Sequence, residues 1–86
     1  MTRGDDYILQ FFVEADIAAS PNVIGYNIDY SRQYVARRCS TLADGGLLNR
    51  VDEEKAMYRI TDLGLNYIKD QLTDEEIERV ESAVDV

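Results

Sequence analysis

Residues 31–46 of this chain read SRQYVARRCSTLADGG, and this stretch decides the fold. Its apolar side chains recur at spacings of four and three residues, which places them on one face of a helix: Val35, Cys39 and Leu42. Ser31 can cap the start of this helix. Gly45-Gly46 can end it, because glycine adopts the left-handed C-cap conformation without steric cost. We therefore predict an amphipathic helix from Ser31 to Asp44.

The other faces of this helix are polar and cationic: they carry Arg32, Gln33, Tyr34, Arg37, Arg38 and Thr41. A net charge of -8 argues against a nucleic-acid partner, because phosphate contact depends on Lys and Arg. The charge is unevenly distributed, however. Residues 31–60 hold six basic and four acidic residues, a net +2, whereas the rest of the chain carries -10. The positive charge thus lies where a DNA-reading helix needs it.

Two shorter helices are predicted before this one. The apolar spacing in residues 5–15 indicates a helix from Asp5 to Ala15, and residues 17–19 form a link that could pair as a small strand. Ser20-Pro21 can begin a second helix that runs to Ile28, with its apolar residues turned inward: Val23, Ile24 and Ile28. A connector of about three residues, Asp29–Ser31, then joins two short helices, which is typical of a helix-turn-helix.

A hairpin and two more helices are predicted after Gly46. Residues 47–51 and 56–60 are strand-like and are joined by an acidic tip at residues 52–55. Thr61 can cap a fourth helix with its apolar side chains toward the core, namely Leu63, Tyr67 and Ile68, and an early Gly64 suggests close backbone packing. Thr73-Asp74-Glu75-Glu76 matches a capping box. The thin apolar stripe that follows indicates either a helix folded back on the domain or a dimerisation helix: Ile77, Val80 and Val84.

This order of elements is that of an α+β, mostly α, winged helix-turn-helix: a three-helix core, a two-stranded wing, a following helix and a short C-terminal helix. Residues 31–51 resemble the reading helix and first wing strand of multiple-antibiotic-resistance-repressor-like regulators, and Tyr58–Gly64 (YRITDLG) resembles their step from wing to helix. Over residues 5–70 the chain most resembles small phage-repressor-like winged-helix proteins of halophilic archaea. Seven Arg against two Lys, with many acidic residues, is also similar to halophilic proteins.

The resemblance implies a transcriptional regulator, most simply a repressor, that sets the helix 31–44 into the major groove of duplex DNA. The N-terminal end of such a helix lies closest to the base edges, so we expect base contacts from Ser31, Arg32, Gln33 and Tyr34. Arg32 could form a bidentate pair with guanine and Gln33 with adenine, although Tyr34 could instead pack against the second helix. Phosphates or a second base are expected to be contacted by Arg37, Arg38, Thr41, Arg50, Lys55 and Arg59.

Composition excludes much other chemistry. One Cys and no His cannot form a Cys/His zinc site, an intrachain disulfide or a His-based triad, so we expect no enzyme, metal or cofactor. Cys39 is interpreted as a core residue. No run of apolar residues approaches the roughly 20 that span a membrane, and we expect a cytoplasmic protein with no evident small-molecule effector.

Two further expectations concern assembly. We divide the chain into a DNA-binding domain, residues 1–72, and a C-terminal helical extension, residues 73–86. A homodimer is expected, because a two-fold pair places two reading helices about 34 Å apart on a palindrome. The acidic wing tip and the charge of -10 outside residues 31–60 leave an alternative open, in which the winged helix binds a protein and not DNA.

Overall fold

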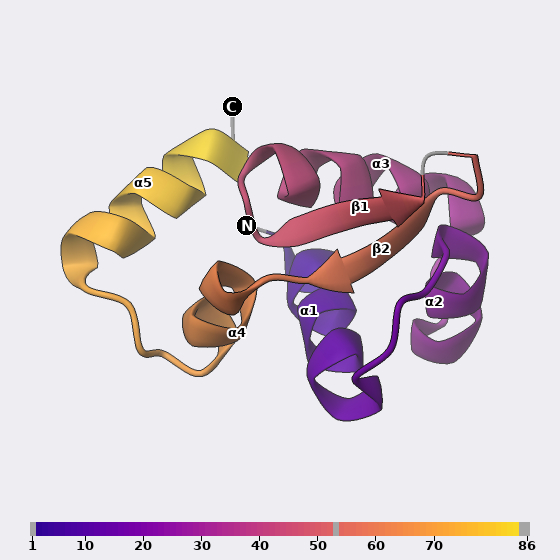
Figure 1. Ribbon diagram of the computed structural model, residues 1–86, viewed down its shortest axis with the longest axis horizontal. Helices are drawn as coiled ribbons and strands as arrows, with labels where there is room; N and C mark the ends of the chain where they lie inside the picture. The colour runs from indigo at the N-terminus through magenta and orange to yellow at the C-terminus, as the bar shows by residue number, and fades with distance from the viewer. Residues whose placement is uncertain (1, 53, 85–86) are drawn as a thin grey trace.

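The computed structural model describes residues 2–52 and 54–84, in which five helices and two strands form. In chain order they are α1 (Arg3–Ala15), α2 (Pro21–Ile28), α3 (Arg32–Asp44), β1 (Leu48–Asp52), β2 (Met57–Ile60), α4 (Asp62–Ile68) and α5 (Asp74–Val84). Figure 1 shows α3 running behind the β1–β2 hairpin, with α2 at one end of the molecule and α5 at the other. This arrangement confirms the predicted winged helix-turn-helix.

The first helix begins two residues earlier than predicted. The hydroxyl of Thr2 accepts a hydrogen bond from the backbone N–H of Asp5 (3.1 Å), and the Asp5 carboxylate accepts one from the N–H of Thr2 (3.0 Å). This reciprocal capping box satisfies two N–H groups at the helix start. Asp5 is therefore the third residue of α1, and not its first.

A tight turn joins α2 to α3, as predicted. Asp29 adopts a left-handed conformation (φ 62°) at the end of α2, and the Ser31 hydroxyl caps α3 by accepting from the N–H of Tyr34 (3.2 Å). A side chain at Gly25 would place its Cβ only 2.7 Å from the carbonyl oxygen of Tyr30, so glycine permits this close approach. The inward assignment of Val23 was wrong, because its position on the short helix leaves it 43% exposed.

The core lies between α1, α3 and the hairpin. Val35, Cys39 and Leu42 of α3 are fully buried, which confirms the predicted apolar face. Their neighbours in the same cluster include residues from α1, the hairpin and α5: Ile8, Leu9, Phe12, Leu48, Tyr58, Val80 and Val84. Burial raises the pKa of the Cys39 thiol to about 12, with the negative charge of Asp5 adding to the effect. Cys39 is a small core residue, as expected from the sequence.

The two glycines after α3 have different roles, which corrects the simpler prediction. Gly46 is the left-handed residue (φ 83°), whereas Gly45 has an ordinary helical conformation. A Cβ at Gly45 would lie 2.7 Å from Cγ2 of Val84, so the absence of a side chain lets α5 pack on the end of α3. The α5 helix thus folds back on the domain. Thr73 and Glu76 form the predicted capping box at its start.

The hairpin is antiparallel, with Leu48 opposite Ile60 and Arg50 opposite Tyr58, and its register shifts between Arg50 and Asp52. The predicted small strand at residues 17–19 is reduced to one bridge, in which Ala19 exchanges two 2.9 Å hydrogen bonds with Tyr58.

The step from the hairpin to α4 is tightly packed. The hydroxyl of Thr61 donates to the carbonyl oxygen of Gly46 (2.7 Å) and accepts from the N–H of Gly64 (3.0 Å). A Cβ at Gly64 would collide with the carbonyl oxygen of Leu47, which confirms the close packing predicted there. As predicted, the apolar side chains of α4 pack on the core: Leu63, Tyr67 and Ile68. None of the helices in the described ranges has both the length and the apolar character needed to cross a membrane.

Candidate nucleic-acid interface

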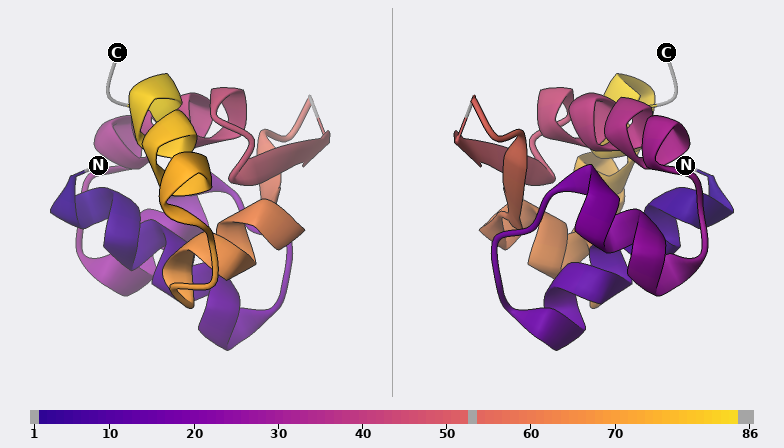
Figure 2. Two further views of the ribbon diagram at one scale, coloured as in Figure 1. Left: turned by 90° about the vertical axis from the view of Figure 1, so that its left-hand side faces the viewer. Right: turned by 90° about the vertical axis from the view of Figure 1, so that its right-hand side faces the viewer.

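One face of α3 is open to solvent along about two turns. This face, called here the exposed stripe, consists of Gln33, Ala36, Arg37 and Ser40. Figure 2 shows that α3 and the end of the hairpin lie on the same upper side of the molecule, with α2 beneath α3. Exposed Asp44 ends the same face, so the surface that suits a polyanion is the N-terminal part of the helix.

Three elements meet beside the N-terminal end of α3. A shallow groove there is lined by residues from the start of α2, from α3 and from the hairpin tip: Ser20, Pro21, Asn22, Arg32, Gln33, Ala36, Lys55 and Ala56. Of the predicted contacts, the groove brings together Arg32, Gln33 and Lys55. Sequence reasoning assigned only a capping role to Ser20 and did not single out Asn22. Both residues lie at the start of α2, the first helix of the helix-turn-helix. Because this helix crosses the DNA backbone in such motifs, their position could have indicated them as candidate backbone contacts.

One of the three acids at the tip of the wing, Asp52, is hydrogen-bonded within the turn. The Asp52 carboxylate accepts hydrogen bonds from the backbone N–H groups of Glu54 (3.1 Å) and Lys55 (3.2 Å). Its charge is therefore partly satisfied within the turn, and it is only half exposed. Lys55 is exposed at the same tip. Glu54 is also exposed, and the third acid of this turn, Glu53, falls outside the described residues.

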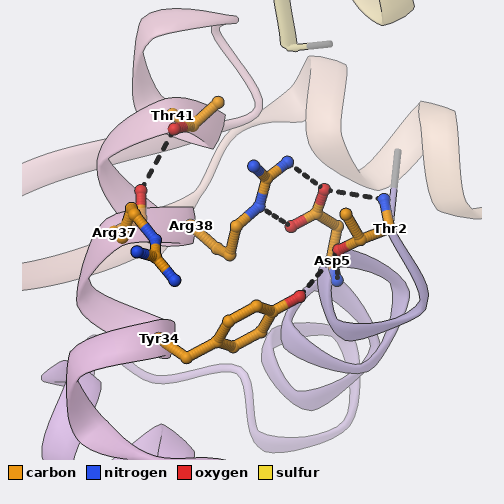
Figure 3. Close-up of polar contacts among 6 residues, drawn as sticks. All are labelled: Thr2, Asp5, Tyr34, Arg37, Arg38 and Thr41. Atoms are coloured by element: carbon orange, nitrogen blue, oxygen red, sulfur yellow. Dashed lines mark hydrogen bonds and ion pairs between the residues drawn. The ribbon is translucent and has the colours of Figure 1, made fainter.

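Arg38 is paired within the fold. Its Nε lies 2.8 Å from Oδ1 of Asp5 and its Nη2 lies 2.6 Å from Oδ2, so the guanidinium binds the carboxylate through two hydrogen bonds (Figure 3). The Asp5 side chain is fully buried and that of Arg38 is 17% exposed. Burial by itself raises the pKa of Asp5. The hydrogen bonds from Arg38 and Thr2 outweigh burial and hold this pKa below its usual value of 3.8.

The hydroxyl of Tyr34 points toward α1, and its ring packs on Tyr30, in the turn that follows α2. This hydroxyl lies 2.9 Å from that of Thr2 (Figure 3). The Tyr34 ring stacks on that of Tyr30, with the centroids 5.2 Å apart. Tyr34 is half-buried, whereas its neighbour Gln33 is exposed. The guanidinium carbon of Arg37 lies 6.0 Å from the centroid of the Tyr34 ring.

The other predicted contacts lie away from the exposed stripe or serve the fold. Arg50 donates a hydrogen bond to the hydroxyl of Tyr58 and covers its ring, with the guanidinium carbon 5.2 Å from the centroid. Arg59 is opposite Asn49, on the outer side of the hairpin, because alternate residues of a strand face opposite sides. The hydroxyl of Thr41 donates to the carbonyl oxygen of Arg37 (3.1 Å). DNA contact by these residues, and by Ser31 and Arg38, stays a prediction.

A helix-turn-helix with an exposed, cationic second helix and a hairpin beside it is the arrangement of winged helix-turn-helix DNA-binding proteins. The model of the winged helix-turn-helix phage repressor family matches residues 1–80. The chain belongs to this family, whose members are non-enzymatic DNA-binding repressors. It is 36% identical over 81 residues to the repressor protein of Halobacterium phage phiH, an alignment that covers 92% of this chain and 91% of the relative. No solved structure matches the chain significantly.

Proposed function

We propose that this protein is a sequence-specific repressor that inserts the N-terminal part of α3 into the major groove of duplex DNA. The observation that carries the proposal is the exposed stripe of α3, with Arg32 and Lys55 beside it. These cations stand out in a chain with a net charge of -8. The major groove admits one α-helix, and it presents a distinct pattern of donors and acceptors for each base pair.

The exposed residues divide into two roles. Gln33 and Arg32 lie at the end of α3 that approaches base edges, where an amide can pair with adenine and a guanidinium with guanine. Arg37, one turn later, and Lys55, on the wing tip, are suited to phosphates, which fix the orientation of the protein on the duplex. Arg38 has a different task in this proposal, because its pairing with Asp5 joins α3 to α1.

The test uses two variants with the same change in charge. Arg32→Ala with Arg37→Ala removes two cations from the proposed interface, whereas Lys69→Ala with Arg79→Ala removes two exposed cations from α5 and the end of α4. Duplexes enriched by the wild-type protein from genomic fragments in molar salt serve as targets. We expect the first variant to lose binding to them, with its circular dichroism unchanged, and the second to keep it. Equal binding by both would refute the role of α3.

We further propose that the repressor acts as a homodimer in the cytoplasm. The protein measures 33 × 25 × 24 Å, so two copies side by side could set their reading helices about 34 Å apart. The extension at residues 73–86 is anchored by buried Val80 and Val84, but its outer side carries Asp74, Glu75 and Glu78, and like charges oppose a symmetric contact.

The outer side of α1 is the better dimer surface in this proposal. Tyr7 there is 48% exposed and lines a groove with Phe11 and Ile28. Sedimentation in molar salt should show a dimer that Tyr7→Glu converts to monomer. Glu78→Lys, on the outer side of α5, serves as the control and should leave the dimer intact. If only the Glu78 variant loses the dimer, the dimer contact lies on α5 and not on α1.

A further inference from the structure

Tyr34 connects the first turn of α1 to the exposed stripe of α3. Its hydroxyl is within hydrogen-bond distance of that of Thr2, and its ring is stacked on Tyr30 at an interplanar angle of 21°. The ring can lie here only because position 4 is glycine. A Cβ at Gly4 would be 2.5 Å from the Tyr34 hydroxyl oxygen and 2.6 Å from Cε2. The Tyr34 ring is therefore held by its hydroxyl, which contacts Thr2, and by its face, which stacks on Tyr30.

The same ring lies under Arg37. The guanidinium carbon is 6.0 Å from the ring centroid, the outer limit of a cation–π contact, and Arg37 is exposed on the stripe while Tyr34 is half-buried beside it. Figure 3 shows Arg37 and Tyr34 side by side on α3, with the Tyr34 ring extending to Thr2. A free arginine side chain samples many rotamers, and ordering it on binding costs free energy. A fixed aromatic support reduces that cost.

We infer that Tyr34 is a positioning residue for DNA binding: its ring, anchored on α1, holds Arg37 in the orientation in which the guanidinium meets a DNA phosphate. The inference rests on the proposed function of α3. It also gives Tyr34 a role other than the base contact expected from its place near the start of the helix. An exposed cation–π contact corresponds to a factor of about two to five in an equilibrium constant.

A double-mutant cycle tests the inference, because a positioning residue acts only while the residue it positions is present. Binding to a duplex selected by the wild-type protein is measured for wild type, Tyr34→Leu, Arg37→Ala and the double variant. Each affinity refers to the folded fraction, which circular dichroism determines. We expect Tyr34→Leu to weaken binding about two- to fivefold in the wild-type background and to have little effect in the Arg37→Ala background.

Tyr34→Phe is the conservative variant. It keeps the ring under Arg37 and on Tyr30 but removes the contact with Thr2, whose hydroxyl still caps α1. We expect it to bind nearly as the wild type does. If it binds as weakly as Tyr34→Leu, the ring is not the support and the inference fails.

The remaining outcomes separate this inference from the proposed function. Equal losses for Tyr34→Leu in both backgrounds overturn the positioning role and indicate a general structural role. If those equal losses come with a changed base preference, Tyr34 contacts a base. In both cases the function of α3 stands, because Arg37→Ala still weakens binding. If Arg37→Ala has no effect, the positioning role falls, and the variant lacking both Arg32 and Arg37 then decides whether α3 contacts DNA at all.

Discussion

Arg38 of α3 and Asp5 of α1 form a two-point ion pair, with N···O distances of 2.8 and 2.6 Å and the Asp5 side chain fully buried. The pair lies next to the Tyr34–Thr2 contact, so the first turn of α1 is tied to α3 at two places (Figure 3). The helix that we propose to read DNA is thereby fixed by an element far from it in sequence. The orientation of α3 therefore depends on the buried carboxylate of Asp5.

Removal of Arg38 should destabilise the protein far more than removal of its neighbour. Arg38→Ala leaves the buried Asp5 carboxylate without its partner, and we expect the free energy of unfolding in urea to fall by about 3 kcal/mol. Arg37→Ala, which removes an exposed arginine from the same helix, should change it by about 0.5 kcal/mol or less. Similar losses for both variants would show that the ion pair contributes little.

The same ion pair predicts a loss of stability in acid. Because the pKa of Asp5 is lowered in the folded protein, its contribution is complete above the unfolded pKa of 3.8 and is lost as the pH falls through the lower folded value. Unfolding curves of wild type and Asp5→Asn should therefore differ most near neutral pH, begin to converge below about pH 4, and coincide only below the lowered folded pKa of Asp5. A difference that does not depend on pH would contradict this account.

Gly64→Ala should destabilise the protein although alanine favours helices. The new Cβ would meet the carbonyl oxygen of Leu47, a backbone atom that cannot move aside, and Cγ1 of Ile60 at 2.8 Å. We expect the clash to cost up to about 3 kcal/mol, which outweighs the roughly 1 kcal/mol gained in helix propensity and leaves a net loss of stability. Asn66→Ala, at an exposed position of the same helix, is the control and should be neutral or slightly stabilising. A stabilised Gly64 variant would mean that α4 shifts easily.

Gln33 and Lys55 should affect DNA binding in different ways. Gln33→Ala should relax the preference at one base pair by about 1–3 kcal/mol, because it removes the base contact that we propose for this side chain. Lys55→Ala should weaken binding to selected and unrelated duplexes alike, and it should reduce the slope of log K against log salt by about 0.9. Titrations of both duplexes at several salt concentrations distinguish the two patterns. A changed base preference in the Lys55 variant would assign this wing residue to base reading.

The thiol of Cys39 should not react in the folded protein. It is fully buried and its pKa is raised to about 12, so almost no thiolate exists at pH 8. An aromatic disulfide reagent should modify it only in denaturant, with a stoichiometry of one per chain. Fast modification of the native protein would show that the core between α1 and α3 opens readily.

Most of the fold could be predicted because its signals are local. Several features each depend on residues only a few positions apart: the apolar face of residues 31–44, the helix caps at Ser20, Ser31 and Thr61, and the capping box at Thr73. All of them appear in the structure as predicted. Two errors were local, the start of α1 and the inward assignment of Val23, whereas another arose because a residue has its partner far along the chain. Gly45 resembles a simple helix stop, but its role depends on Val84, 39 positions later.

For the candidate site, the sequence by itself determined that α3 forms, which of its faces is apolar, and that positive charge gathers there in an acidic chain. These properties follow from residue spacing and charge. Only the tertiary structure decided which group each arginine of α3 contacts, because these groups come from other parts of the chain or from another turn of the helix. Arg38 meets a buried carboxylate, Arg37 lies over Tyr34, and Arg32 faces the groove shared with Lys55. Similar side chains on one helix thus acquire different roles through contacts that sequence periodicity cannot encode.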